Sequence, residues 1–380
     1  MSALALKDMT ICNDAIPEIE ITNEYKNDNS SHHPTDDQIT QFREDGYSIF
    51  PRVFSQATVD ALNHRLELVL RGEYDTGFRP DKTPKRIKTK MPIVSIDKFS
   101  CENGQTMHGK NSDETRTKKL ALGYSGNKRK KVLQVINIHK SDRLFRELVT
   151  CPLLGMLVAK LMNWEEGARL CQDQIWAKPP GAPPLAFHRD SPYFMFDPSP
   201  VATVWIALDN MENELGPLTY VRGSHKWGDG RVGSSQNFFQ DDGGTALLFS
   251  AAEKEGVDIE SLEFESMNKL LAGGLSIHGK IIFLYVTAFV FVAILLKKDC
   301  FLIADGRTWH GSSANMSDMP RRGIGLHFVP VNVKWRRDAM KSSLWRKYVE
   351  GVIESGGEVN EIELNHETFP VTWTPNSVDL

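Results

Sequence analysis

Residues 187–190 read Phe-His-Arg-Asp, and they open a dense stretch that continues through Val204-Trp205 and Gly216-Pro-Leu to Arg222-Gly-Ser-His225. His188 and Asp190 are two positions apart, so on a β-strand both side chains would leave the same face. An imidazole beside a carboxylate supplies two of the three ligands of a 2-His-1-carboxylate facial triad. Such a triad holds non-haem Fe(II) and leaves coordination positions open. The stretch therefore predicts a metal centre on a β-strand scaffold.

The third ligand is expected to be a histidine much later in the chain, and His310 fits. It ends the segment Phe301-Leu-Ile-Ala-Asp-Gly-Arg-Thr-Trp-His310, an apolar run followed by a polar turn. This pattern predicts a strand that delivers its last residues to a rim. His225 is a competing candidate ligand, whereas His278 and His327 are more typical of histidines with structural hydrogen bonds.

Arg321 suggests an anion contact. It lies eleven residues after His310 and begins a strand-like segment ending at Pro330. A guanidinium at this place can bind the distal carboxylate of 2-oxoglutarate through two parallel hydrogen bonds. Arg322 is the alternative, because neighbouring residues on a strand face opposite ways and only one can enter a pocket.

These motifs together resemble the phytanoyl-CoA dioxygenase (PhyH) family of Fe(II)- and 2-oxoglutarate-dependent oxygenases, over about residues 35 to 332. The resemblance implies that His188, Asp190 and His310 hold Fe(II), which binds 2-oxoglutarate and O2. It also implies that Arg321, Ser312, Trp205 and Gln134 contact the co-substrate or line its pocket. The expected reaction is hydroxylation of a C–H bond of a small organic or acyl substrate, with succinate and CO2 as co-products. The family's halogenating relatives lack the carboxylate ligand, so Asp190 favours hydroxylation.

The expected fold class is mainly β with flanking helices, built on a double-stranded β-helix core of the jelly-roll, cupin-like type. Short strands separated by turns rich in proline and glycine indicate this class. We expect a disordered lead over residues 1–34, the oxygenase domain over 35–335 and a C-terminal extension over 336–380.

Helix boundaries are marked by capping signals. Thr35 to Gln38 has the form of a capping box, and Gly46 is a plausible helix end. Ser55 is expected to begin a longer helix, and Pro152 to divide an apolar stretch into two helices or kink a single one.

Composition narrows the possible partners and compartment. The chain has 380 residues, 41% of them apolar and 25% charged, with a net charge of −4. This balance predicts no general affinity for nucleic acid or an anionic membrane. The five cysteines are scattered without a Cys-x-x-Cys pair, which favours a reducing compartment. No signal peptide, transit peptide or C-terminal peroxisomal signal is evident, so the cytoplasm is the expected location.

Two further segments carry separate hypotheses. Residues 191–196 form an aromatic stretch that is expected either to pack at the rim of the pocket or to contact substrate. The basic stretch from 79 to 131 is interpreted as a solvated loop, or else as a surface that recognises an anionic substrate.

The run of residues 281–296 does not fit the rest of the domain. It is apolar, uncharged and bracketed by Lys280 and Lys297-Lys298 within an anomalous segment of about 280–298. It is shorter than the roughly 20 residues a membrane helix needs, and it interrupts the chain between candidate site strands. Our interpretation is a translated intron or similar gene-model error, and membrane contact is expected only if the run is a genuine part of the protein.

Two other classes of function remain open from the sequence. One is a non-catalytic member of the family that serves as a binding or scaffold protein. The other is a hydrolase that holds zinc or another divalent ion with the same ligands. Iron content and succinate production distinguish these classes from an oxygenase.

Overall fold

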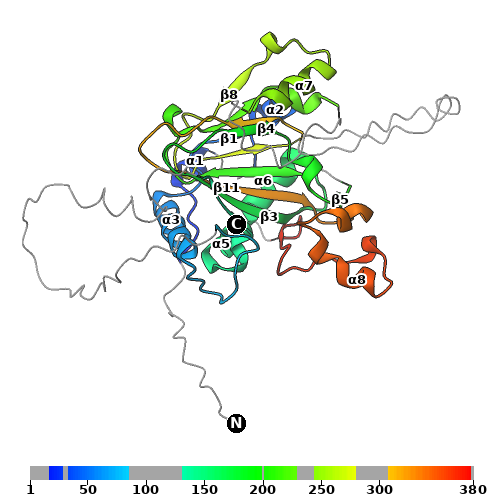
Figure 1. The fold of residues 1–380 in the computed structure, drawn as a ribbon. Helices are drawn as coiled ribbons and strands as arrows, with labels where there is room; N and C mark the ends of the chain where they lie inside the picture. The colour runs from blue at the N-terminus through cyan, green and yellow to red at the C-terminus, as the bar shows by residue number, and fades with distance from the viewer. Residues whose placement is uncertain are drawn as a thin grey trace, which may run out of the picture.

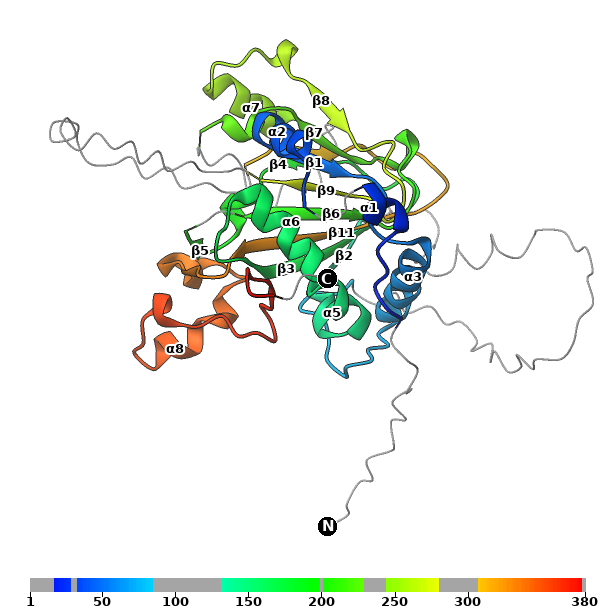
Figure 2. The ribbon, with the colours of Figure 1, turned by 180° about the vertical axis from the view of Figure 1, so that it is seen from behind.

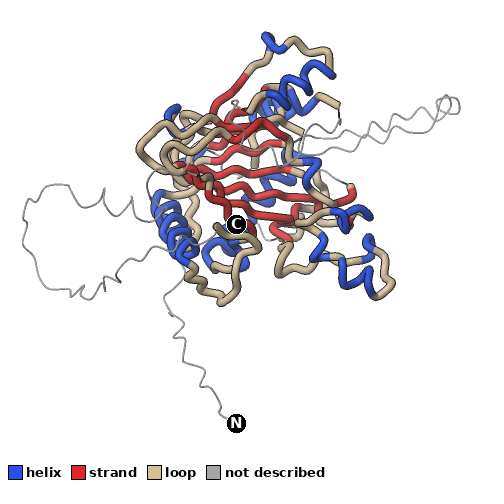
Figure 3. Tube along the Cα trace, in the orientation of Figure 1, coloured by secondary structure: helices blue, strands red, loops and turns tan. Residues whose placement is uncertain are grey.

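Strands fill the middle of the molecule and helices surround them (Figures 1 and 3). The computed structural model describes residues 17–28, 33–84, 131–198, 201–228, 244–279 and 307–377. Its strands form two antiparallel sheets that face each other, with a short third sheet of two strands, β5 (Phe196–Asp197) and β12 (Lys334–Trp335).

The large sheet has the strand order β1-β9-β6-β11-β3-β13, and β2 also pairs with β3. Its strands are β1 (Tyr47–Phe50), β2 (Leu133–Ile136), β3 (Ala168–Lys178), β6 (Ala202–Ala207), β9 (Leu275–His278), β11 (Arg321–Pro330) and β13 (Val371–Trp373). The small sheet has the order β4-β10-β7-β8. Its strands are β4 (Leu185–His188), β10 (His310–Ser312), β7 (Leu218–Val221) and β8 (Phe264–Ser266). Neighbours far apart in sequence pair throughout, and the expected jelly-roll class is confirmed.

Aromatic side chains join the inner faces of the two sheets. Tyr47 of β1 stacks on Tyr220 of β7, with ring centroids 4.8 Å apart. Trp205 of β6 and Leu218 of β7 belong to the same buried cluster. This cluster closes one part of the space between the sheets and leaves the remainder for a cavity.

Helices cover the outer face of the large sheet, as the view from behind shows (Figure 2). They are α2 (Asp36–Asp45), α3 (Gln56–Arg71), α5 (Arg143–Val149) and α6 (Pro152–Met162). Thr35 and Gln38 form the expected capping box of α2, and Gly46 ends that helix in the left-handed conformation. Pro152 occupies the first turn of α6, where its missing N–H costs no hydrogen bond, so the apolar stretch is indeed two helices. Apolar residues of these helices and of the sheet make the largest buried cluster.

The outer face of the small sheet has its own cover. Helix α7 (Ala246–Lys254) contributes Leu248 and Ala252 to a cluster with Phe187 and Trp309 from the region of β4 and β10. Both sheets are thus buried on two sides near the strands that hold the candidate ligands.

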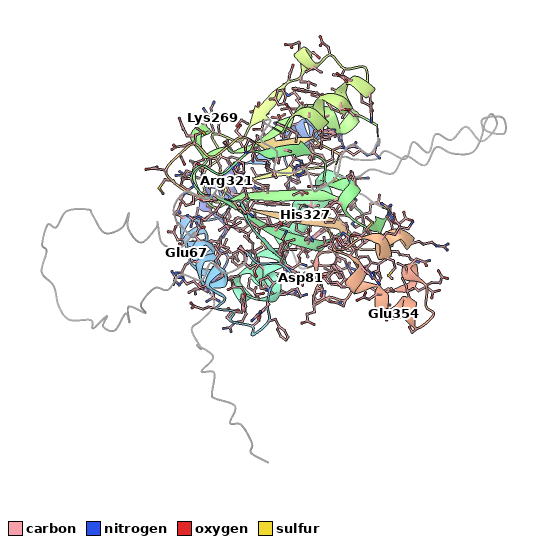
Figure 4. All side chains as sticks on the ribbon, in the orientation of Figure 1. Glu67, Asp81, Lys269, Arg321, His327 and Glu354 are labelled. Carbon is pink, nitrogen blue, oxygen red and sulfur yellow. The ribbon has the colours of Figure 1, made fainter. Side chains whose placement is uncertain are left out.

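The C-terminal stretch packs as part of this core. Strand β13 pairs with residues 168–169 of β3. Trp335 and Trp345 pack against Phe196 in a second large cluster. The carboxylate of Asp81 accepts a hydrogen bond from the Tyr348 hydroxyl at 2.5 Å and binds Lys140 and Lys347 at 2.9 Å and 3.0 Å. Asp81 lies between the sheet and this C-terminal segment (Figure 4).

The expected disordered lead over residues 1–34 is wrong for residues 17–28. Helix α1 spans Asn23–Asp28, Ile21 bridges to Phe54, and Tyr25 is buried against the main cluster. Residues 1–16, the apolar run 281–296 and most of the basic stretch 79–131 lie outside the described residues. Within the described ranges, no helix combines the length and the apolar character needed to cross a membrane.

Candidate metal centre

His188, Asp190 and His310 come together at the junction of β4 and β10. His188 is the last residue of β4, and it lies directly opposite His310, the first residue of β10. Asp190 precedes the short 3₁₀ helix η2 (Ser191–Tyr193) and has helical backbone angles. The expectation that His188 and Asp190 share one strand is therefore wrong, as is the placement of His310 at the end of its strand. The turn after His188 brings the carboxylate back toward both imidazoles.

The three side chains offer ligand atoms that all lie within 4.8 Å of one another. The Oδ1 atom of Asp190 is 3.8 Å from Nε2 of His188 and 3.7 Å from Nε2 of His310. The two imidazole rings are tilted, with centroids 4.3 Å apart. Two ring nitrogens and one carboxylate oxygen thus face a common point, which is the donor set of the facial triad.

The tautomers of the two histidines suit metal binding. Nδ1 of His188 donates to the carbonyl oxygen of Ala186 at 2.8 Å, and Nδ1 of His310 donates to that of Thr308 at 3.0 Å. Each Nε2 is then left with a lone pair directed at the site. Burial lowers the pKa of both histidines to about 4, with smaller effects from neighbouring charged groups. Both rings are consequently neutral, and able to bind a cation, at neutral pH.

The second oxygen of Asp190 is held by hydrogen-bond donors from β6 and β9. Oδ2 accepts from the hydroxyl of Thr203 at 2.6 Å and from Nε2 of His278 at 3.2 Å. His278 in turn accepts at Nδ1 from the Tyr220 hydroxyl at 3.0 Å, and Ser276 lies 2.8 Å from that hydroxyl. Burial alone would raise the pKa of Asp190, but His310 and His278 hold it well below its usual value. The carboxylate therefore stays ionised, with one oxygen fixed and the other directed at the site.

Arg321 starts β11 and points into the space between the sheets. Its side chain is 2% exposed, lies over the Trp205 ring at 5.6 Å, and donates to the carbonyl oxygen of Gly216 at 3.2 Å. A side chain at Gly323 would collide with this indole, because a Cβ there would lie 2.5 Å from Cζ2 of Trp205. Burial lowers the pKa of Arg321 to about 10, so the group remains charged at neutral pH. Arg322 turns the other way and binds Asp209 through two hydrogen bonds.

A second buried basic side chain lies beside Arg321, and it was not predicted from the sequence. Lys178, the last residue of β3, is the cross-strand partner of Arg321 and is 1% exposed. Its amine donates to the Ser312 hydroxyl at 2.9 Å and also to the carbonyl oxygen of Ser313. In the described part of the chain, no carboxylate forms an ion pair with Lys178 or Arg321. A buried guanidinium beside a buried amine that can take up a proton, without an acidic partner among the described residues, fits a site for a carboxylate ligand.

A cavity lined by Arg321 also reaches the three candidate ligands His188, Asp190 and His310. The other residues that line it include Gln134, Gln174, Trp176, Tyr193, Phe194, Trp205 and Leu218. Gln134 donates to Gln174 at 3.2 Å and accepts from the exposed amine of Lys82 at 2.5 Å. The aromatic stretch thus divides in role, because Tyr193 and Phe194 face the cavity while Phe196 packs against the C-terminal tryptophans.

His225 takes no part in this cluster. Nε2 of His225 lies 3.1 Å from the carbonyl oxygen of Arg43, beneath the turn at Gly46, where an added Cβ would meet the imidazole at 2.4 Å. His225 belongs to the short 3₁₀ helix η4 (Ser224–Lys226), and its ring packs this helix against the end of α2.

A family model for phytanoyl-CoA dioxygenase (PhyH) matches residues 42–323 of this chain. The chain belongs to the phytanoyl-CoA dioxygenase family. This PhyH protein is therefore an Fe(II)- and 2-oxoglutarate-dependent oxygenase, and His188, Asp190 and His310 form a potential metal site. A phytanoyl-CoA dioxygenase of Arabidopsis thaliana is 22% identical over 309 residues, covering 80% of this chain and 92% of the relative.

Solved structures similar to the PhyH protein share its fold at low sequence identity. The α-ketoglutarate-dependent carbocyclase SnoK from nogalamycin biosynthesis has a TM-score of 0.54 at 18% identity, covering 88% of this chain and 95% of that one. The epimerase SnoN, in complex with Fe3+, α-ketoglutarate and nogalamycin RO, has a TM-score of 0.51 at 17% identity, covering 79% and 85%.

The residues of the PhyH protein fit both iron and its co-substrate. The two imidazoles, whose Nε2 atoms face Asp190, and the anchored carboxylate suit Fe(II). The guanidinium of Arg321 and the amine of Lys178 have no acidic partner among the described residues, and together they suit the distal carboxylate of 2-oxoglutarate.

Loss of the Thr203 hydroxyl should weaken metal binding while leaving all three ligands in place. Thr203→Val keeps the side-chain shape but removes one donor to Asp190. We expect affinity for Mn(II), measured by isothermal titration calorimetry, to fall about tenfold, since such supporting contacts typically contribute 10- to 100-fold. Thr219→Val is the matched control, because Thr219 faces the opposite way from Leu218 and Tyr220 on β7. It should bind Mn(II) like the wild type. Equal affinity in both variants would contradict a role for Thr203.

Proposed function

We propose that the protein hydroxylates a C–H bond of a small organic or acyl substrate, with conversion of 2-oxoglutarate and O2 to succinate and CO2. The observation that supports this best is the placement of the His188, Asp190 and His310 donor set on the same cavity as Arg321. The metal and 2-oxoglutarate, which would reach from the metal to Arg321, would then occupy one continuous space.

The protein's residues have distinct tasks in this reaction. Bound Fe(II) supplies the redox chemistry that links decarboxylation of 2-oxoglutarate to oxidation of the substrate. His188, Asp190 and His310 fix the ion and leave open positions on the cavity side. Arg321 orients the distal carboxylate, and Trp205 covers that part of the cavity and excludes water. Asp190 occupies a ligand position that a halide would otherwise need, which favours hydroxylation over halogenation.

Oxygen-dependent turnover tests the proposal. The iron-loaded protein should convert 2-oxoglutarate to succinate in air and stop under nitrogen, and a metabolite extract should stimulate this turnover. A product 16 mass units heavier than its substrate, and 18 units heavier when the reaction is run in ¹⁸O2, would establish hydroxylation. Binding of 2-oxoglutarate without any succinate would favour the non-catalytic alternative, and oxygen-independent product formation with zinc would favour a hydrolase.

Lys178 is proposed to complete the site for the distal carboxylate. Its amine bridges to Ser312 and faces the same region as Arg321. Burial, followed by the charge of Arg321, lowers the pKa of Lys178 to about 6. The amine is therefore mostly neutral at pH 7.5, and a carboxylate placed beside it would favour its protonated form.

Binding of 2-oxoglutarate should consequently take up a proton, and its affinity should fall as pH rises from about 6 to 8. The sign follows because the pKa of Lys178 is higher in the complex than in the free protein, so proton and ligand assist each other. The fall is at most about tenfold per pH unit for one coupled group. Calorimetry in two buffers of different ionisation enthalpy measures the proton uptake directly.

The variant Lys178→Met should bind 2-oxoglutarate more weakly and lose this pH dependence. Lys334→Met, at an exposed position of β12, is the control and should keep both. A pH slope that persists in Lys178→Met would assign the coupled proton to another group.

A further inference from the structure

His327 lies on the cavity face of β11, in a row that begins at Arg321. Alternate residues of a strand share a face, so Arg321, Gly323, Gly325 and His327 all point between the sheets. Arg321, Gly325 and His327 line the cavity. Figure 4 shows Arg321 near one end of the strand and His327 farther along it.

Hydrogen-bond directions determine which nitrogen of His327 carries the proton. The Thr203 hydroxyl has a single proton, which it donates to Oδ2 of the Asp190 carboxylate at 2.6 Å. Its oxygen can then only accept from Nδ1 of His327, which lies 2.9 Å away. A neutral His327 with its proton on Nδ1 has a lone pair on Nε2.

That Nε2 lone pair has no partner among the described residues. The side chain is 6% exposed, and Phe194 packs against its ring with centroids 4.9 Å apart. A buried acceptor without a donor is unfavourable and uncommon in folded proteins. A ligand that supplies a donor would remove this cost.

Gly325 leaves room for such a ligand. A Cβ added at this position would meet no atom closer than Nε2 of His327, at 3.7 Å. Glycine thus keeps open the floor of the cavity next to the lone pair. This space adjoins the metal centre, since Nδ1 of the same ring is 3.6 Å from Oδ2 of Asp190.

We propose that Nε2 of His327 accepts a hydrogen bond from a hydroxyl or N–H group of the substrate. This inference rests on the proposed oxygenase function and narrows its substrate class. The substrate is a molecule that bears a donor close to the carbon presented to the metal, rather than an unsubstituted hydrocarbon chain. His327 therefore acts in substrate selection, and Phe194 packs against the face of its imidazole ring.

Nuclear magnetic resonance on the full-length protein loaded with Zn(II) and 2-oxoglutarate tests the hydrogen bond. With ¹⁵N-labelled histidine, the His327 ring should show a protonated Nδ1 and an unprotonated Nε2. Cyclohexanol and methylcyclohexane serve as probes of nearly equal size that differ in the donor. Cyclohexanol should shift the Nε2 resonance and bind more tightly than methylcyclohexane. A proton on Nε2, or equal responses to the two probes, would overturn the proposal.

Two substitutions separate the acceptor from the support of the metal centre. His327→Asn can place its amide N–H where Nδ1 lies and lacks an acceptor at the Nε2 position. We expect its cyclohexanol affinity to fall about 3- to 10-fold, as for loss of one neutral hydrogen bond, with methylcyclohexane unaffected. His327→Gln reaches farther with its carbonyl oxygen and should recover part of the preference. If both variants kept the full preference for cyclohexanol over methylcyclohexane, the role of Nε2 would be contradicted.

Failure of this inference is distinguishable from failure of the proposed function. Calorimetry first establishes whether the Zn(II)-loaded protein binds 2-oxoglutarate. If it does not, the oxygenase proposal itself is at fault. If it does and the probes are not discriminated, only the assignment of His327 is wrong.

Discussion

Replacing Asp190 with alanine is expected to abolish metal-dependent succinate production and to lower metal affinity by more than about 100-fold. The carboxylate is the only anionic ligand of the triad, and both histidine Nε2 atoms converge on its Oδ1. The substitution also leaves the donors of Thr203 and His278 without their acceptor, which costs about 1–3 kcal/mol of folding stability. Succinate production at the wild-type rate in Asp190→Ala would refute the triad.

Thermal unfolding with and without Mn(II) provides the measurement for Asp190. A ligand at 100 times its Kd stabilises the folded state by about 2.7 kcal/mol, so the wild type should show a metal-dependent rise in Tm and the variant none. His225→Gln is the control, because His225 packs against α2 and lies outside the triad. It should lower the Tm of the metal-free protein yet keep the metal-dependent rise.

The second large effect is expected from Arg321→Leu, which should weaken 2-oxoglutarate binding by about 2–5 kcal/mol. This is the usual cost when one partner of a buried, hydrogen-bonded charge pair is removed. Metal affinity should change little, because Arg321 contacts Gly216 and Trp205 and none of the three ligands. Titration of 2-oxoglutarate into the Mn(II)-loaded variant measures the loss.

Arg322→Leu is the matched control for Arg321, since the two residues are adjacent on β11 and face opposite ways. Its loss removes the bidentate contact with Asp209, so the free energy of unfolding should fall while 2-oxoglutarate affinity stays near that of the wild type. If only Arg322→Leu bound 2-oxoglutarate weakly, the anion contact would belong to Arg322 and not to Arg321.

Much of the fold was predictable because local signals agree with the tertiary structure. The capping box at Thr35, the left-handed Gly46 and the proline that starts α6 all occupy their expected places. Sequence alone could not establish that the C-terminal stretch enters the large sheet, because the pairing of β13 with β3 joins residues about 200 positions apart.

The candidate site was predictable in its ligands but not in its supports. His-x-Asp and a distant histidine form a motif, whereas Thr203 and His278 look ordinary in their own strands. Strand alternation could have placed Thr203 on the face of Trp205 and His327 on that of Arg321. Lys178 carried no local signal, because its role depends on being the cross-strand partner of Arg321. The wrong placement of Asp190 on the β4 strand arose because spacing alone cannot separate a continued strand from a turn.

The shared edge of β3 has a consequence for how the protein avoids self-association. Strand β2 pairs with residues 174–177 of β3 and β13 pairs with residues 168–169, so each protects part of the same edge. An unpaired strand edge is a template for pairing with another chain. A chain that stopped before residue 371 would lack β13. It would therefore expose the part of that edge that β13 covers in the intact protein, together with the tryptophan-rich cluster beneath it. Premature termination should therefore yield insoluble oligomers built by edge-to-edge strand addition, rather than a merely less active monomer.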